Sequence, residues 1–185
     1  MRSAAFRATD LNKILRAELG PRLKDMGFKQ LGSTGWVRSA EGEHHVVAVQ
    51  ASQSGWDPHS GNRFVVEFER SERPARATGF SRQRIWGVLD EVSRREALRI
   101  NDHVAETLPP PNQQILRELP PELRPHYLAH FERTGRSVDA TTDVWFAYYD
   151  EHDAAAWATF LGRNVPLAFA AFLREPPSLF GHREC

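Results

Sequence analysis

Residues 44–70 constrain the fold more than any other part of the chain, because they read as two β-strands joined by a long loop. In residues 44–52 the side chains alternate with the two-residue period of a strand, and valine is frequent. In residues 64–69 one face carries Phe64, Val66 and Phe68, and the other carries Val65, Glu67 and Glu69. The pair predicts an antiparallel sheet with one apolar face under helices and one face at least partly in water.

The loop between these strands, residues 53–62, is longer than a tight turn requires and is rich in glycine, serine, proline and asparagine or aspartate. Trp56 lies within it. Long loops that carry an aromatic residue often serve in recognition, which makes Trp56 a candidate binding residue. The alternative is that the indole ring folds back over the edge of the sheet, because tryptophan is seldom exposed.

Polar side chains of the two strands form a second candidate site. Gln50, Ser52 and Arg63 join Glu67 and Glu69 in one patch if the strands pair in a matching register. Paired carboxylates can perform acid–base chemistry or hold Mg²⁺, so Glu67 and Glu69 are candidate catalytic residues. Solvated cross-strand pairs explain the same pattern, and the lysine of comparable nuclease strands is absent after Glu69. We therefore favour a binding patch that includes Gln50, Ser52 and Arg63.

The composition is that of an ordinary globular protein, since 41% of the 185 residues are hydrophobic and 26% are charged. This length fits a single α+β domain over residues 1–185, with a candidate internal boundary near 109–119 and a loose tail at 176–185. The single cysteine, Cys185, allows no disulfide within the chain, and no signal peptide or membrane span is evident. We expect a cytoplasmic protein with no cofactor and no membrane partner.

Helical periodicity precedes the hairpin. Apolar residues recur at helical spacing from Leu11 to Met26, and this stripe is the expected cover of the apolar sheet face. Pro21 is expected to kink this helix or to begin a second one. With further strands at residues 32–38 and 144–149, the chain predicts an antiparallel sheet of about four strands with helices mainly on one face.

Three further helices are expected after the hairpin. The first is capped by Ser81, the second opens at Pro120, and the third is capped by Asp153. Gly162 and Pro166 are expected to break the third helix, because glycine and proline are the poorest helix formers.

Several of these segments together resemble a bacterial family known as domain of unknown function 4304. The similar segments are the helix of residues 11–23, Met26-Gly27-Phe28, Trp36-Val37-Arg38, Val49-Gln50-Ala51-Ser52 and Phe64-Val65-Val66. The resemblance covers roughly residues 9–108. It implies a bacterial, cytoplasmic α+β domain, and it brings no activity and no catalytic residues to this chain.

Glu122, His126 and His130 are spaced four residues apart, so one helix would present all three on the same face. Two histidines at this spacing can chelate a metal ion. However, Tyr127 stands where the zinc-protease pattern has glutamate, and no third ligand is obvious. A solvent-facing polar stripe is the simpler interpretation, and a metal site is the alternative.

The formal net charge is zero, but the charge is unevenly distributed, with +5 over residues 1–100 and −5 over residues 101–185. Arginines gather between Arg70 and Arg99, as they do on some nucleic-acid-binding surfaces. Acidic residues are interspersed with them, so a salt-bridged helix face explains the same cluster.

No nucleophile elbow, phosphate-binding loop or dinucleotide fingerprint is present in the sequence. The leading hypothesis is therefore a non-enzymatic binding protein whose partner is another bacterial protein. A small metal-dependent hydrolase or nuclease is the second hypothesis. Nucleic-acid binding through the arginine-rich face is the third, although nucleic acid is not the expected partner.

Overall fold

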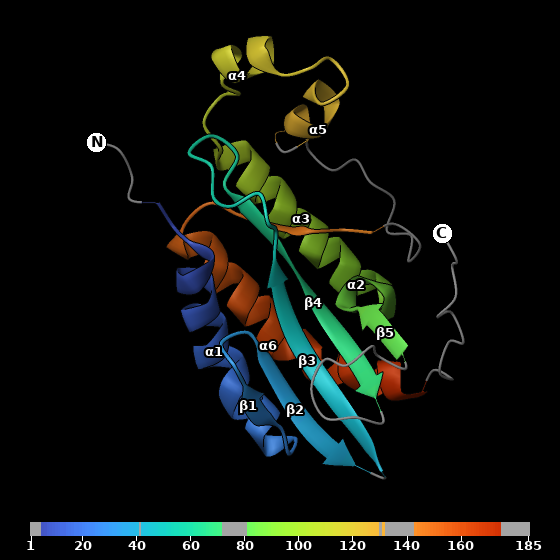
Figure 1. Ribbon diagram of the computed structural model, residues 1–185. Coiled ribbons are helices and arrows are strands. Elements are labelled where there is room, and N and C mark those ends of the chain that lie inside the picture. Colours follow the sequence, from blue (N-terminus) through green and yellow to red (C-terminus); the bar gives the residue numbers. More distant parts are fainter. Residues whose placement is uncertain (1–4, 41, 72–80, 130, 132–142, 175–185) are drawn as a thin grey trace.

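The structure is a computed structural model that describes residues 5–40, 42–71, 81–129, 131 and 143–174 (Figure 1). In this part of the chain six strands form one antiparallel sheet, in the spatial order β1-β2-β3-β4-β5, with β6 also paired to β4. Their bounds are β1 Lys29–Leu31, β2 Gly35–Ala40, β3 Glu43–Ala51, β4 Asn62–Ser71, β5 Ser81–Arg84 and β6 Phe146–Tyr148. The prediction of an antiparallel α+β sheet is confirmed, but the expected number of about four strands is too low.

The predicted hairpin forms the centre of the sheet as β3 and β4, with Val47 opposite Phe68 and Val49 opposite Val66. The missed strands, β1 and β5, are short, and they depend on neighbours for their hydrogen bonds. β6 lies within the strand expected at residues 144–149. β5 and β6 occupy successive parts of the same edge of β4, because β5 pairs with residues 67–70 and β6 with residues 62–64. A strand of three or four residues carries too little alternation to be recognised in a sequence.

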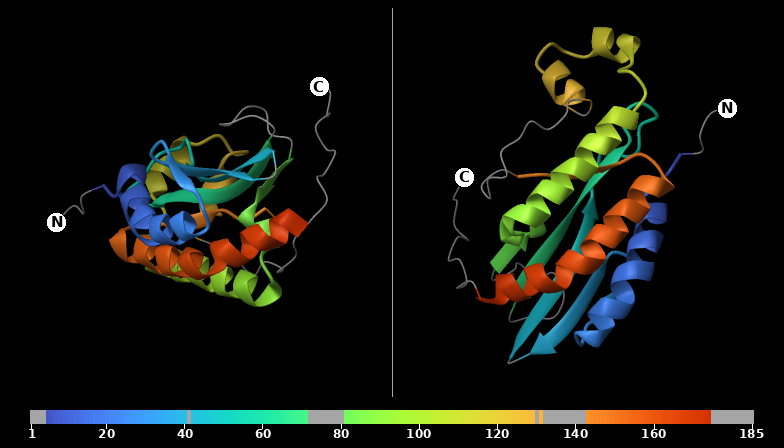
Figure 2. Two further views of the ribbon diagram at one scale, coloured as in Figure 1. Left: turned by 90° about the horizontal axis from the view of Figure 1, so that it is seen from below. Right: turned by 180° about the vertical axis from the view of Figure 1, so that it is seen from behind.

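The helices are α1 Ala8–Asp25, α2 Ile85–Val88, α3 Glu91–Thr107, α4 Gln113–Glu118, α5 Arg124–Leu128 and α6 Glu151–Arg174. Figure 2 shows that α1, α6 and α3 lie side by side on one face of the sheet. The short helices α4 and α5 lie apart from this layer, beyond the end of the sheet at the top of Figure 1. Among the described helices, none combines the length and the apolar composition that a membrane span requires.

The core lies between the sheet and this helix layer. Phe64, Val66 and Phe68 are fully buried there, in the same cluster as Leu15 and Leu23 of α1, as the sequence predicts. Within the helix layer, however, the rings that contact β4 come from α6. Between ring centroids, Phe68 lies 5.5 Å from Phe169 and 5.7 Å from Phe172. Phe64 lies 6.0 Å from Trp157. The carboxy-terminal helix is therefore the element that covers β4 directly, and α1 completes the layer beside it.

The expected break in the last helix is wrong, since α6 runs through both Gly162 and Pro166. Gly162 is explained by packing, because a Cβ atom there would lie 2.6 Å from Glu18 Oε1 of α1. The glycine thus allows two long helices to approach closely. Pro21 likewise lies inside α1, which continues to Asp25 as one helix.

Two further expectations about helix starts need correction. Ser81 begins strand β5 rather than capping a helix, and the cap of α3 is Asp90, whose side chain accepts a hydrogen bond of 2.7 Å from Ser93 N. Pairing with β4 decides the strand conformation of residues 81–84, which local propensity does not reveal. The helix expected from Pro120 is confined to α5 at Arg124–Leu128, and α4 was not expected. The expected tail at 176–185 lies outside the described residues.

Candidate functional site

The face of the sheet that points away from the helix layer, here called the outer face, carries the predicted polar patch. A pocket of about 390 Å³ opens on it, and its polar lining consists of Thr34, Gln50, Glu67, Glu69 and Arg82. We call it the strand pocket. The β3–β4 register places Ala48 opposite Glu67, and the β4–β5 register places Arg82 opposite Glu69. The strand pocket brings Gln50, Glu67 and Glu69 together as expected, but Ser52 and Arg63 of the same predicted patch line a different pocket. Arg82 was missed.

The two carboxylates of the strand pocket are buried. Glu67 is 4% exposed and Glu69 is 6% exposed, so the expectation of solvated cross-strand pairs is wrong. Arg82 explains their burial, because its guanidinium hydrogen-bonds Glu67 and lies 3.3 Å from Glu69 Oε1. Arg84 Nε lies 3.5 Å from the second oxygen of Glu67. The side chain of Arg82 is itself 54% exposed, so it covers the carboxylates from the solvent side.

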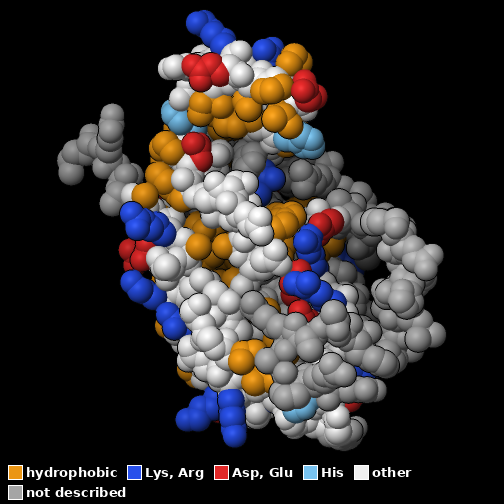
Figure 3. All heavy atoms as spheres, in the orientation of Figure 1, with side chains coloured by type: hydrophobic (Ala, Val, Ile, Leu, Met, Phe, Trp, Pro, Cys, Tyr) orange, Lys and Arg blue, Asp and Glu red, His pale blue; other side chains and the backbone are white. Residues whose placement is uncertain are grey.

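The neighbours of this pocket add further charge pairs. Arg84 also bonds Asp143, and its guanidinium lies 4.9 Å from the centre of the Trp145 ring. Arg82 Nη2 donates to Gln50 Oε1 at 3.4 Å. Figure 3 shows the outer face, where blue and red side chains mix to the right of its centre. The arrangement suits hydrogen bonding and ion-pair exchange with a ligand.

The same geometry weighs against a metal at Glu67 and Glu69. Both oxygens of Glu67 lie within reach of a guanidinium. A Mg²⁺ ion would therefore have to displace an arginine before it could bind. Within the described ranges, no group of three or more histidine, cysteine, aspartate or glutamate side chains is placed to hold a metal ion.

A second hollow on the outer face, here called the loop pocket, has a volume of about 300 Å³. It lies between the β3–β4 loop and the segment that contains α4 and α5. Polar residues Ser52 and Arg63 line one side, and the other side consists of Ile115, Leu119, Leu123 and Tyr127. Arg63 Nη2 donates to Ala129 O at 3.1 Å, which links β4 to the end of α5.

The apolar wall of the loop pocket is unusually accessible. Neither α4 nor α5 contains a buried residue, and Leu123 between them is 47% exposed. Figure 3 shows hydrophobic side chains gathered over these two helices at the top of the molecule. Polar contacts hold the segment to the sheet and its loop, including Asn112 Nδ2 to His59 Nε2 at 3.2 Å. Apolar surface is therefore presented around a hollow and remains available for contact.

Trp56 does not belong to either pocket. Its indole Nε1 donates to Tyr149 O at 2.9 Å, and its ring lies 5.5 Å from the Tyr149 ring. It is partly buried against the core cluster. Trp56 therefore folds back onto the rest of the protein, as in the alternative interpretation. It is not a free recognition residue.

The candidate metal ligands are not brought together. Glu122 is exposed and precedes α5, whereas His126 is exposed on α5 itself. His130 lies outside the described residues. The single helix that would align these side chains therefore does not extend back to Glu122.

Sequence reasoning missed Arg82 and the apolar wall of the loop pocket. A signal for Arg82 was present, because Arg82 and Arg84 alternate along a strand with the same spacing as Glu67 and Glu69. For Ile115, Leu119 and Leu123 the sequence offers no comparable signal, since their pocket depends on where the segment folds back.

A buried polar cluster lies near the other end of the sheet. His45 is 5% exposed, its Nδ1 accepts from Arg38 Nε at 3.3 Å, and its Nε2 lies 3.3 Å from Glu43 Oε2. Burial lowers the pKa of His45, with the positive charge of Arg38 acting in the same direction and Glu43 opposing it. The histidine is thus held neutral between an arginine and a glutamate, which is a structural role.

Most described arginines of the cluster between residues 70 and 99 are paired within the fold. Arg70 pairs with Glu43 at 3.1 Å, Arg82 and Arg84 pair with the strand-pocket carboxylates, and Arg95 pairs with Glu91. Their positive charge is largely balanced locally, which leaves less field for attracting phosphates. Arg73 and Arg76 lie outside the described residues.

The geometry of the strand pocket and the loop pocket is what bears on the function of this chain. No protein-family model, curated protein or solved structure matches it.

Proposed function

We propose that this protein is a non-catalytic binding module that holds a short segment of another protein across the outer face of its sheet. The observation that supports the proposal is the adjacency of the two pockets. Gln50 lines the strand pocket and Ser52 lines the loop pocket, and both lie on β3 or at its end, two positions apart. Two residues of a strand span about 7 Å, which matches the distance between alternate side chains of an extended peptide.

The chemistry of the pockets defines what such a segment carries. The strand pocket offers carboxylates that are covered by a half-exposed arginine, so a basic side chain of the partner can take over the position of Arg82. The loop pocket offers aliphatic and aromatic side chains around a hollow, which suits an apolar side chain. A basic residue close to an apolar residue is the expected recognition motif.

The burial of Glu67 and Glu69 supports a functional use of this site. Removing carboxylates from water costs several kcal/mol per ion, and the attraction to paired arginines offsets that cost only when the geometry is favourable. Apolar residues at the same positions would hold two strands together without this cost. Under this proposal the partner is a bacterial cytoplasmic protein, in keeping with the resemblance to the domain of unknown function 4304 family.

Selection from a phage-displayed library of random short peptides tests the proposal. We expect enriched peptides that place arginine or lysine within two or three positions of an aromatic or aliphatic residue. Leu123→Glu closes the apolar side of the loop pocket, and it should weaken binding of a selected peptide by roughly tenfold or more, measured by fluorescence anisotropy.

Leu167→Glu is the matched control, because Leu167 is also an exposed leucine, at 68% against 47% for Leu123, and it lies on the helix layer away from both pockets. It should leave peptide affinity unchanged. Failure to enrich any motif, or equal binding of the selected peptide to the Leu123→Glu variant, would show that the outer face is not a peptide site.

A further inference from the structure

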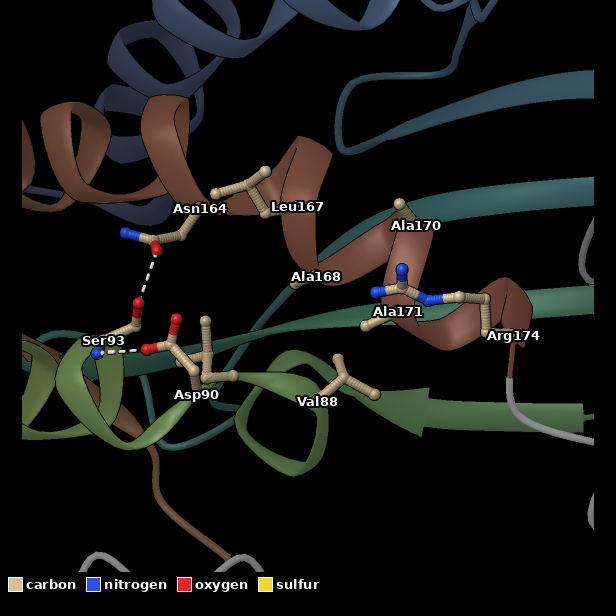
Figure 4. Close-up of a pocket in the computed structure, with 10 residues that line it drawn as sticks. Val88, Asp90, Ser93, Asn164, Leu167, Ala168, Ala170, Ala171 and Arg174 are labelled. Carbon is tan, nitrogen blue, oxygen red and sulfur yellow. Dashed lines mark hydrogen bonds between the residues drawn. The ribbon is translucent and has the colours of Figure 1, made fainter.

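The helix layer has a groove of its own on the side that faces away from the sheet. It has a volume of about 350 Å³ and lies between the α2–α3 junction and the second half of α6 (Figure 4). Its walls are mainly apolar, with Val88, Leu89, Leu167, Ala168 and Ala171 among the lining residues. One end is closed by the hydrogen bond from Ser93 Oγ to Asn164 Oδ1, at 2.7 Å. We call it the helix groove.

Large apolar side chains project beside this groove. In the described part of the chain three large hydrophobic residues are exposed, and two of them, Val92 at 72% and Leu167 at 68%, flank the Ser93–Asn164 contact. Leu167 lies one turn after Asn164 on α6, and Val92 directly precedes Ser93 on α3. Adjacent exposed apolar side chains around a hollow are a mark of an interaction surface rather than of ordinary solvent exposure.

The groove also carries one charge of each sign. Asp90 lies beside Ser93 towards one end, and Arg174 lies at the other end, as Figure 4 shows. Both side chains belong to exposed residues, and hydrogen bonds from Ser93 keep the Asp90 pKa low. Arg174 has no hydrogen bond or ion pair with any other described residue. Arg174 is exposed at the end of α6, where an anionic group of a partner molecule can approach it.

We infer that a second copy of this chain docks on the helix groove and forms a two-fold symmetric dimer. A two-fold interface uses the same patch on both copies, so that patch must be complementary to itself. This surface supplies the hollow and a projecting leucine to enter it, and it supplies both the acid and the base. In the dimer Leu167 of each copy enters the groove of the other, and Asp90 of each copy faces Arg174 of the other.

The surrounding charges fit a second copy better than a highly charged partner. Glu91 pairs with Arg95, and Glu96 pairs with Arg163, so the rim beside Val92 and Leu167 is balanced between the two signs. A balanced rim repels neither an identical surface nor its rotated copy. The helix groove and the outer face lie on opposite sides of the molecule, so each copy of the dimer keeps its strand pocket and loop pocket free.

Sedimentation velocity over a range of protein concentrations tests the inference. The full chain should sediment as a dimer, and Leu167→Glu should raise the dimer dissociation constant by roughly tenfold or more. Leu123→Glu is the control, because it places the same substitution on the opposite side and should leave the dimer intact. Circular dichroism and the melting temperature establish that each variant is folded.

Charge exchange provides the sharper readout. Arg174→Glu alone and Asp90→Arg alone place like charges opposite each other, so each variant by itself should be monomeric. When the two variants are mixed, every facing pair becomes opposite in sign, and a heterodimer should form. A wild-type chain that remains monomeric at all concentrations, or a dimer that survives both Leu167→Glu and Arg174→Glu, overturns the inference. Neither outcome affects the peptide-binding proposal, which depends on Leu123 and not on Leu167.

Discussion

At the scale of single residues, charge placement is the most informative feature of this molecule. Glu67 and Glu69 are almost completely buried, and Arg82 joins them from a strand that begins ten positions beyond β4. The pattern of alternate glutamates indicated which face they occupy, but it did not indicate which cation would meet them. Burial followed from that meeting, because an unpaired carboxylate is too costly to remove from water.

Removing Arg82 should therefore destabilise the protein, because it leaves a buried carboxylate without its partner. We expect Arg82→Ala to lower the free energy of unfolding by about 1–3 kcal/mol at neutral pH, because Glu69 loses its guanidinium partner. Adding Glu69→Gln should recover part of the loss. Urea denaturation of the single and double variants measures both effects.

Arg95→Ala is the matched control for this cycle. Arg95 pairs with Glu91, and both side chains are more than half exposed, so the loss should stay below about 0.5 kcal/mol. Equal effects of the Arg82 and Arg95 substitutions would contradict the interpretation that the strand-pocket pairs are special.

His45 makes stability depend on pH in a defined direction. Its pKa in the folded protein is below the usual 6.5, chiefly because the ring is buried, so the unfolded chain binds the proton more readily. The stabilisation is complete above pH of about 6.5 and is lost as the pH falls through the lowered folded pKa. The facing groups are Arg38, Glu43, Arg70 and the ring of Phe169.

Urea unfolding at pH 7.5 and at lower pH, compared between the natural chain and His45→Gln, isolates this contribution. We expect the natural chain to lose more stability on acidification than the variant does. All other groups are the same in both proteins, so their contributions cancel in the comparison. A steeper loss in the variant would mean that His45 does not carry the effect.

At the scale of elements, close approach between distant segments decides several features that composition leaves open. Gly162 leaves room on α6 for the Glu18 side chain of α1, and Gly61 permits the β3–β4 loop to touch the backbone at the end of β6. From the sequence, both glycines were interpreted as local signals, for a loop or for the end of a helix. The role of each is instead set by a segment about 85 to 145 residues away in the chain.

Gly61 and Gly55 form a natural pair for testing this point, since both have positive φ angles, of 66° and 74°. Replacing Gly55 with alanine meets open space and should cost about 1 kcal/mol, from the left-handed conformation alone. Gly61→Ala would place Cβ 2.3 Å from Tyr148 O, so it should cost about 2–4 kcal/mol. Thermal unfolding compares the two, and equal losses would show that the loop moves freely away from β6.

At the scale of the whole molecule, the arrangement separates a stable body from a lightly attached segment. The sheet and its helix layer share one continuous core, whereas α4 and α5 contribute no buried residue. The outer face and the helix groove lie on opposite sides of that body. Binding at one side can therefore proceed without disturbing the other.

Hydrogen exchange should reveal this division directly. Amide protons of β3, β4 and α6 should exchange at rates close to those set by global unfolding, and those of α4 and α5 should exchange far faster. A bound peptide that occupies the loop pocket should slow exchange in α4 and α5. High protection of these two helices in the free protein would contradict their description as lightly attached.

The sequence by itself determined the central hairpin, its buried face with Phe64, Val66 and Phe68, and the first helix. These features follow from two-residue and 3.6-residue periods, which neighbouring positions of the sequence reveal. Only the tertiary structure decided that β5 pairs with β4, that α6 runs unbroken over it, and that residues 112–129 form a wall of the loop pocket. These features depend on contacts between distant segments. Pairing and packing energies overrode the local preferences of Ser81, Gly162 and Pro166, and no local pattern records those energies.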